Sequence, residues 1–448
     1  MGRPEGEHRG AQREGAGVIA PSTALAPDAA LSPRALAAYG ALAVPLAMAA
    51  LPLYVHLPKF YGDHLGVPLA ALGGLLLVLR LADALVDPLL GAWSDRARSR
   101  RQPIAWAMPV LAIGLAALFV PPVREGAALL AWLGVALALV YAAFSLATIS
   151  HGAWGAELSS DPVERTRITA VREALALAGV VVASVAPVLL AGADGEAAGM
   201  RRFALAFVGV ALACTAATLV LAPAAPMPAA PHAPMREGVA RALRDPLFRR
   251  LLAVFVANGS ASAIPATLVL FFVADVLDAE RQQGLFLALY FVAGAAGMPL
   301  WVRVSARIGK VRAWLAAMAL AVVAFVWAAL LGAGDVAAFA LICALSGLAL
   351  GADLALPPSL LADVIGRRGR MESTGAYFGL WTLATKLNLA LAAGLALPLL
   401  AWLGYAPGTR DASELRALAF VYAGVPCVLK AAAALVLVRF DTRWRSAP

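Results

Sequence analysis

The sequence predicts an all-α membrane protein with twelve transmembrane helices in two pseudo-symmetric six-helix halves. Its composition, twelve apolar segments of spanning length and a proline-rich central segment predict this fold class. Of the 448 residues, 62% are hydrophobic and 14% are charged, whereas soluble domains average about 45–50% and about 25%. Because a soluble fold could not bury so much apolar surface, the expected solvent is lipid.

The apolar segments are counted at about 20 residues per span. The first six predicted helices cover residues 34–57, 67–93, 103–121, 127–157, 166–191 and 201–222. The second six cover residues 247–275, 282–303, 312–332, 336–364, 373–402 and 415–439. They define a first half over 34–222 and a second half over 247–440.

The segments outside the two halves are polar or rich in proline. Residues 223–246 begin with PAAPMPAAPHAP, which cannot be helical, and continue as the basic amphipathic stretch MREGVARALRDP. We expect this segment to be a cytoplasmic linker. Residues 1–33 never become continuously apolar, which favours a disordered cytoplasmic tail over a signal peptide. Residues 441–448 form a short cytoplasmic tail.

The distribution of Lys and Arg predicts the orientation. Of the 36 basic residues, 26 fall on the side that holds both termini and 7 on the opposite side. The positive-inside rule therefore predicts an inner-membrane protein with both termini in the cytoplasm. The net charge of +9 comes from short loop clusters, so no nucleic-acid partner is expected.

Two loops repeat each other at the same place in their halves. Residues 91–101 follow the second predicted helix, and residues 303–312, also rich in arginine, follow the eighth. Two related halves around a midplane site suit alternating access, although any loop that flanks a span collects arginines. The three cysteines lie inside apolar runs with no metal-ligand spacing, so we expect unpaired thiols and no bound metal other than sodium.

The second predicted helix carries Arg80, Asp83 and Asp87 within the apolar region. A charge at the bilayer centre costs at least ~2.5–3.5 kcal/mol, which makes each one a functional candidate. Asp83 and Asp87 are four residues apart and share a helix face. Two neighbouring carboxylates disfavour double ionisation, so the pair is predicted to take up a proton or a cation such as sodium. Alternatively, Arg80 neutralises Asp83, and Asp87 marks the helix end.

Other polar residues inside the spans are candidates for solute binding, coupling or gating. Lys386 lies near the middle of the eleventh helix and needs a carboxylate or an anionic ligand, whereas Lys430 is close enough to a helix end to reach the interface. The substrate and coupling candidates are Lys386, Arg172, Thr382, Thr148, His151, Asn258 and Asp353; the gating candidates are Arg80, Asp95, Arg96, Glu157 and Arg165. For His151, a buried packing role is the alternative.

Three segments resemble the glycoside-pentoside-hexuronide:cation symporter family, the melibiose permease group of the major facilitator superfamily. The first is RLADALVDPLLG over 80–91, continuing through a basic loop. The others are ISHGAWGAEL over 149–158 and GAYFGLWTLATK over 375–386. Because these segments lie in both halves, the resemblance covers residues 34–440.

The resemblance implies that Asp83 and Asp87 bind the coupling cation. It places Lys386 beside the cation and solute sites and Arg172 near the solute cavity. Val86 stands where sodium-coupled members tend to have a polar residue, which favours protons. The first helix has no acidic residue, and Thr148 stands where the melibiose permease group has a sugar-binding aspartate, which argues against sugar binding by paired carboxylates.

The residues and the resemblance together predict a proton- or sodium-coupled symporter of a small organic solute, such as a sugar or glycoside, and not an enzyme. A carrier of lysolipids or other amphipathic compounds is the alternative within the family, and a membrane sensor that has lost transport is a third interpretation. A membrane-embedded enzyme would need a nucleophile or metal motif, and none is found. We expect no cofactor beyond H+ or Na+, contact with membrane lipid, and a monomer.

Overall fold

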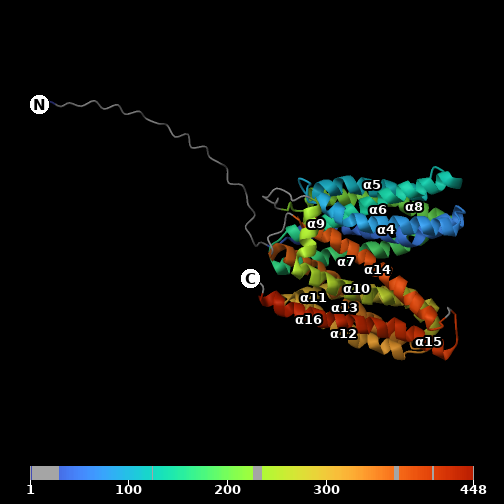
Figure 1. The fold of residues 1–448 in the computed structure, drawn as a ribbon. Coiled ribbons are helices and arrows are strands. Elements are labelled where there is room, and N and C mark those ends of the chain that lie inside the picture. Colours follow the sequence, from blue (N-terminus) through green and yellow to red (C-terminus); the bar gives the residue numbers. More distant parts are fainter. Residues whose placement is uncertain are drawn as a thin grey trace.

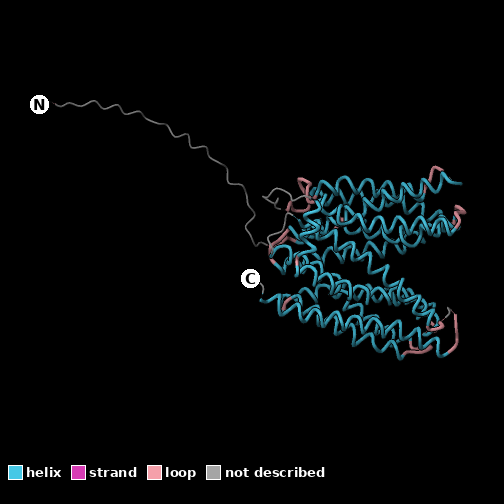
Figure 2. Tube along the Cα trace, viewed as in Figure 1, coloured by secondary structure: helices cyan, strands magenta, loops and turns pink. Residues whose placement is uncertain are grey.

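Helices make up nearly all of the structure, a computed structural model that describes residues 2, 30–123, 125–225, 235–367, 373–405 and 408–446. No strand occurs among these residues (Figure 2). Most of the predicted N-terminal tail and residues 226–234 of the predicted linker lie outside the described part. The all-helical fold class is therefore confirmed for the described residues.

The first span is a chain of short helical segments. It comprises α1 (Pro33–Gly40), α2 (Ala43–Leu51), the π turn η1 (Pro52–His56), α3 (Leu57–Lys59) and the π turn η2 (Phe60–His64). Pro52 and Pro58 lack the N–H group that a regular helix needs, so the hydrogen-bond pattern changes around them. These helical segments continue to His64, past the predicted end at residue 57.

The rest of the first half follows the predicted order. Its helices are α4 (Leu69–Ser94), α5 (Arg101–Phe119), α6 (Gly126–Glu157), α7 (Pro162–Ala191), the short η3 (Gly192–Asp194) and α8 (Glu196–Leu221). Helix α7 begins four residues before the predicted start because Asp161 caps it: the carboxylate accepts hydrogen bonds from the backbone N–H groups of Val163 and Glu164, both at 3.1 Å.

The second half begins after the linker helix. Its elements are α9 (Met235–Arg244), α10 (Pro246–Phe271), η4 (Phe272–Val276), η5 (Glu280–Gln282), α11 (Gln283–Ile308), α12 (Lys310–Phe325), η6 (Val326–Leu330), α13 (Val336–Arg367), α14 (Thr374–Trp402), α15 (Ala412–Ala419), η8 (Phe420–Gly424) and α16 (Val425–Ser446). Helix α16 runs into the predicted C-terminal tail, because residues 441–446 contain neither glycine nor proline.

Ten helical stretches among the described residues are long and apolar enough to cross a membrane. Helices α4 and α14, of 26 and 29 residues, complete the predicted set. At 1.5 Å per residue each exceeds the roughly 30 Å of hydrocarbon in a bilayer. The chain is thus a multi-pass membrane protein, and the count of twelve stays a prediction for α4 and α14.

The two groups of helices lie close together at the end that carries α9 and diverge toward the other end (Figure 1). One apolar cluster lies within the first half, and a second lies around α10, α13 and α15 in the second half. A third cluster joins Ile149 and Ala153 of α6 to α9, α12, α13 and α14. This last cluster holds the halves together at the α9 end.

Helices α4 and α14 approach so closely that glycine is required at their crossing. A Cβ atom on Gly91 would overlap the carbonyl group of Gly375, and a Cβ on Gly375 would overlap that of Gly91. These two helices come from opposite halves. Their backbone contact brings α14 against the acidic face of α4.

Candidate functional site

The acidic pair on α4 meets a lysine from the opposite half. Asp83 and Asp87 lie one helical turn apart, and the Nζ atom of Lys386 on α14 lies 2.5 Å from Asp83 Oδ2 and 2.9 Å from Asp87 Oδ1. Asp87 is completely buried, and the Lys386 side chain is 17% exposed. Two carboxylates and one ammonium group leave this buried cluster with a formal charge of −1.

Ser145 of α6 completes the cluster, a residue that the sequence prediction missed. Its hydroxyl donates to Asp83 Oδ1 at 2.9 Å and accepts from Lys386 Nζ at 2.8 Å. Nothing in the local sequence separates Ser145 from other helical serines. Only the packing of α6 against α4 and α14 reveals its role.

Two buried polar atoms beside this cluster lack a hydrogen bond in the described part of the chain. Asp87 Oδ2 lies 2.8 Å from Lys386 Nζ, within ion-pair distance but without hydrogen-bond alignment. The hydroxyl of Thr148, one turn after Ser145 on α6, also has no partner. Buried oxygens normally find partners, so both could serve as ligands for a proton or a small cation.

Two further candidates lie on the same helices as the pair and its lysine. Arg80 is on α4, three residues before Asp83, and Lys386 is an ion-pair partner of Asp83. Thr382, one turn before Lys386, donates to the backbone oxygen of Phe378 at 3.0 Å. Val86 is 39% exposed and offers no oxygen ligand.

A second ion pair lies within the second half. Asp353 Oδ2 of α13 accepts from Lys430 Nζ of α16 at 2.7 Å, and Asp353 Oδ1 accepts from Asn258 at 3.0 Å and from Trp314 at 2.8 Å. The predicted candidates Asp353 and Asn258 are therefore in contact. Lys430 does not reach toward an interface, because this pair holds it at 8% exposure.

His151 is tied into the packing of the first half. Its Nε2 atom lies 2.9 Å from the backbone oxygen of Tyr39, and the Tyr39 hydroxyl donates to the backbone oxygen of His151 at 2.9 Å. The packing interpretation therefore fits His151 better than solute coupling. Arg172 of α7 is paired with its neighbour Glu173 at 2.5 Å and lies beside Gly152 of α6.

A polar network ties the two halves together at the end of α4. Asp95 accepts hydrogen bonds from the backbone N–H groups of Gly375 at 2.6 Å and Ala376 at 3.0 Å, at the positive end of the α14 dipole. Arg100 bridges Asp95 and Glu157 at 2.7 and 2.6 Å. Burial raises the pKa of the Asp95 carboxyl, whereas Arg100 and the two N–H groups favour its ionised form.

Arg96, a predicted gating residue, is exposed, and Arg100 makes the contacts in this network. Both arginines lie in the basic loop after α4, and sequence spacing does not show which one turns inward. Arg165 lies at a second tie between the halves: its guanidinium contacts Asp363 of α13 at 3.2 Å. Lys310, the first residue of α12, also reaches Asp363, at 2.5 Å.

The comparisons with known proteins decide the family. The model of the family described as MFS/sugar transport protein matches residues 36–443. The chain belongs to this family. The resemblance to the glycoside-pentoside-hexuronide:cation symporters is confirmed, and membership agrees with the prediction of a transporter rather than an enzyme.

Two relatives from Escherichia coli strain K12 show how this family member compares with others. The inner membrane symporter YicJ is 28% identical over 171 residues, 36% of this chain and 36% of YicJ. The putative glycoside/cation symporter YagG is 29% identical over 127 residues, 28% of each chain. The alignments thus span about a third of the length of these relatives.

A solved structure supports the same fold. A bacterial homologue of the iron transporter ferroportin in an outward-facing state aligns with a TM-score of 0.69 at 18% identity, over 92% of this chain and 100% of that chain. At this identity the likeness shows the major facilitator fold alone.

Proposed function

We propose that this MFS/sugar transport family member is a cation-coupled symporter that moves a small organic solute by alternating access. The observation that carries the proposal is the contact of Lys386 with Asp83 and Asp87 across the two halves. Two carboxylates share one ammonium group here, and close, buried carboxylates disfavour double ionisation. One proton or one monovalent cation bound to the pair would relieve this repulsion.

Coupling follows from the position of this cluster. Asp83 and Ser145 belong to the first half and Lys386 to the second, so a proton or cation that binds Asp83 or Asp87 beside Lys386 weakens the attraction between the carboxylates and the ammonium group, which is a contact between the halves. Cation binding thereby changes the relative free energies of the two access states. Only such a difference in affinity can drive the exchange.

The contacts at the α9 end would form the gate on that side. Asp95 holds the first turn of α14, and Arg165 holds Asp363 of α13. We infer that both ties break when the α9 end opens. The bias of basic residues supports a cytoplasmic position for this end. The proposal therefore has twelve spans with both termini in the cytoplasm.

The relatives support a solute of the glycoside class. YagG is named as a putative glycoside/cation symporter, and the family description is sugar transport. The coupling ion is either a proton or sodium. Because the side chain of Val86 supplies no oxygen ligand for sodium, protons are favoured.

Transport assays in proteoliposomes test the proposal. The wild-type protein, Asp83→Asn and Asp87→Asn would be reconstituted and screened for uptake of labelled glycosides under a proton or a sodium gradient. We expect wild-type accumulation above equilibrium and its loss in both variants. Solute exchange without a gradient should persist, which shows folded protein. Gradient-driven accumulation in both variants would refute the role of the aspartates.

A further inference from the structure

The second half encloses a cavity that is separate from the cation cluster. Its volume is about 450 Å³, within the range of about 300–1,000 Å³ that is typical of small-molecule sites. Residues of α10, α11, α12, α13, η8 and α16 line it. All of these elements belong to the second half, so the cavity is not part of the contact between halves.

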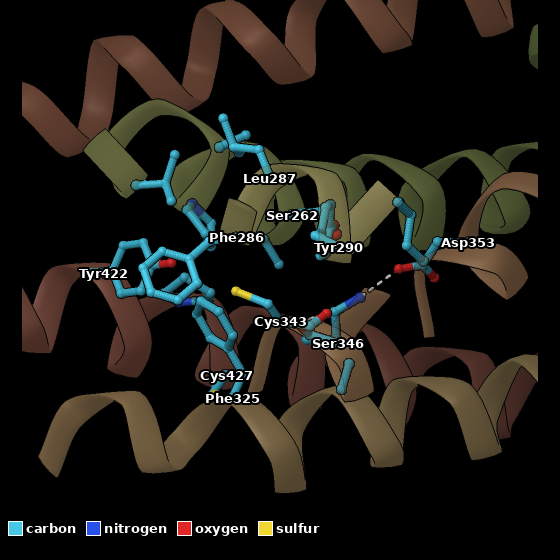
Figure 3. A pocket seen from close by; sticks show the side chains of 18 of the residues that line it. Ser262, Phe286, Leu287, Tyr290, Phe325, Cys343, Ser346, Asp353, Tyr422 and Cys427 are labelled. Carbon is cyan, nitrogen blue, oxygen red and sulfur yellow. Dashed lines mark hydrogen bonds and ion pairs between the residues drawn. The ribbon is translucent and has the colours of Figure 1, made fainter. Parts of the chain in front are cut away.

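The cavity has an apolar end and a polar end (Figure 3). The rings of Phe286, Phe325 and Tyr422 gather at one end, and Asp353 lies at the other. Tyr422 and Phe325 have ring centroids 5.2 Å apart. At the polar end, Asp353 is paired with Lys430, which also lines the cavity.

At the polar end, the groups that can still form hydrogen bonds are mainly donors. Three of the roughly four lone-pair sites of the Asp353 carboxylate are used, by Asn258, Trp314 and Lys430. The Lys430 ammonium group has three N–H donors, and it donates to Asn258 Oδ1 and Asp353 Oδ2. A hydrogen-bond acceptor could bind the remaining ammonium N–H, whereas a donor would find about one lone pair left on the carboxylate.

Two tyrosine hydroxyls add to this unused capacity. Tyr290 and Tyr422 both line the cavity, and neither hydroxyl has a hydrogen-bond partner among the residues that the structure describes. Each hydroxyl can therefore donate to a molecule in the cavity. Tyr290 lies between the ring-lined end and Asp353 in Figure 3, where it could donate to a bound molecule.

We propose that this cavity binds an amphipathic organic compound with an apolar body and a carboxylate head group. The body packs between Phe286, Phe325 and Tyr422, and the head accepts hydrogen bonds from Lys430 and Tyr290. A sugar fits less well, because its many hydroxyl donors would meet rings and aliphatic side chains. This compound is distinct from the glycoside-class solute of the proposed symport, and its site does not depend on that proposal.

Equilibrium binding of labelled octanoate to the full chain in lipid nanodiscs tests the site, with empty nanodiscs as background. Octanoate has the required apolar body and acceptor head, and octylamine is the matched probe with a donor head. We expect saturable binding of octanoate that octylamine does not displace. Equal displacement by both probes, or binding no greater than to empty nanodiscs, would overturn the proposal.

Two pairs of variants separate the site from the fold. Ser262→Trp fills the cavity from α10, whereas Ala253→Trp adds the same ring at an exposed position of α10 outside it. We expect octanoate binding to weaken at least tenfold in the first variant and to be unchanged in the second. Tyr290→Phe removes only a hydroxyl and should weaken binding about fivefold, while Tyr61→Phe in the first half should not.

Native cysteines locate the bound probe. Cys427 lines the cavity and Cys214 lies on α8 in the first half. Octanoate should slow maleimide labelling of Cys427 at least fivefold and leave that of Cys214 unchanged. Equal rates at Cys427 with and without octanoate would contradict the location. If octanoate binds here but no gradient-driven uptake of any solute is found, the site stands and the symport proposal fails.

Discussion

At the residue scale, the proposed function depends on a few charged groups in an apolar surrounding. The sequence alone identified Asp83, Asp87 and Lys386, because a charge inside a spanning helix is costly and therefore conspicuous. It did not identify Ser145 or the pairing of Asp353 with Lys430. A helical serine is unremarkable in sequence, and the partner of a buried lysine depends on which helix packs beside it.

Ser145 provides a prediction for the cation site. Ser145→Ala removes a hydroxyl that bonds both Asp83 and Lys386, and hydrogen bonds to charged groups contribute about 1.5–3 kcal/mol. We expect the apparent affinity for the coupling cation to fall about tenfold, as measured by cation titration of transport. Ser150→Ala on the same helix, where the hydroxyl bonds Ser94 at 2.8 Å, should leave that affinity unchanged. An unchanged value for Ser145→Ala would exclude Ser145 from the site.

At the scale of the elements, the way in which the helices cross determines contacts that the sequence does not predict. Spanning segments and their order were predictable from apolar runs and prolines. The inward turn of Arg100 in place of Arg96 was not, because it depends on the close approach of α4 and α14 at Gly91 and Gly375. Continuous helix beyond residue 440 was also missed, since polar residues alone do not end a helix.

The close crossing predicts a penalty for a single methyl group. Gly375→Ala would place a Cβ against the carbonyl of Gly91, and overpacking typically costs about 1–3 kcal/mol. The thermal unfolding midpoint of the purified protein should fall by several degrees. Gly284→Ala on α11, where an added Cβ meets nothing within 4 Å, should not lower it. Equal midpoints for both variants would argue against the tight crossing.

The gate predicts a change in the distance between halves. Asp363→Asn weakens the contacts that Arg165 and Lys310 make across α7, α12 and α13. Spin labels at Arg96→Cys and Arg307→Cys, both exposed positions, would report the separation at the α9 end in a background without native cysteines. We expect longer distances to gain population in Asp363→Asn. A distribution identical to that of the parent would show that this tie does not hold the gate.

At the scale of the whole molecule, composition predicted a multi-pass membrane protein and the residues of three segments predicted its family. The family model and the structure confirm both. The cavity in the second half could not be predicted, because residues from six separate elements line it. No local pattern brings such residues together.

Topology is a further prediction at this scale. Basic residues favour both termini on the cytoplasmic side. A C-terminal fusion should therefore be fluorescent with green fluorescent protein and inactive with alkaline phosphatase, which folds only after export. Active phosphatase at the C-terminus would show that the C-terminus is exported, and the proposed gate at the α9 end would then face away from the cytoplasm.

In the proposed mechanism, Asp83 and Asp87 form the site of the coupling cation. The most direct measurement is the thermal stability of the purified protein against sodium concentration at several pH values, with Asp87→Asn for comparison. A bound ligand stabilises the folded state by mass action, so we expect a shift with sodium or with pH in the wild type that the variant loses. A shift of equal size in the variant, or no shift with either ion, would contradict the claim.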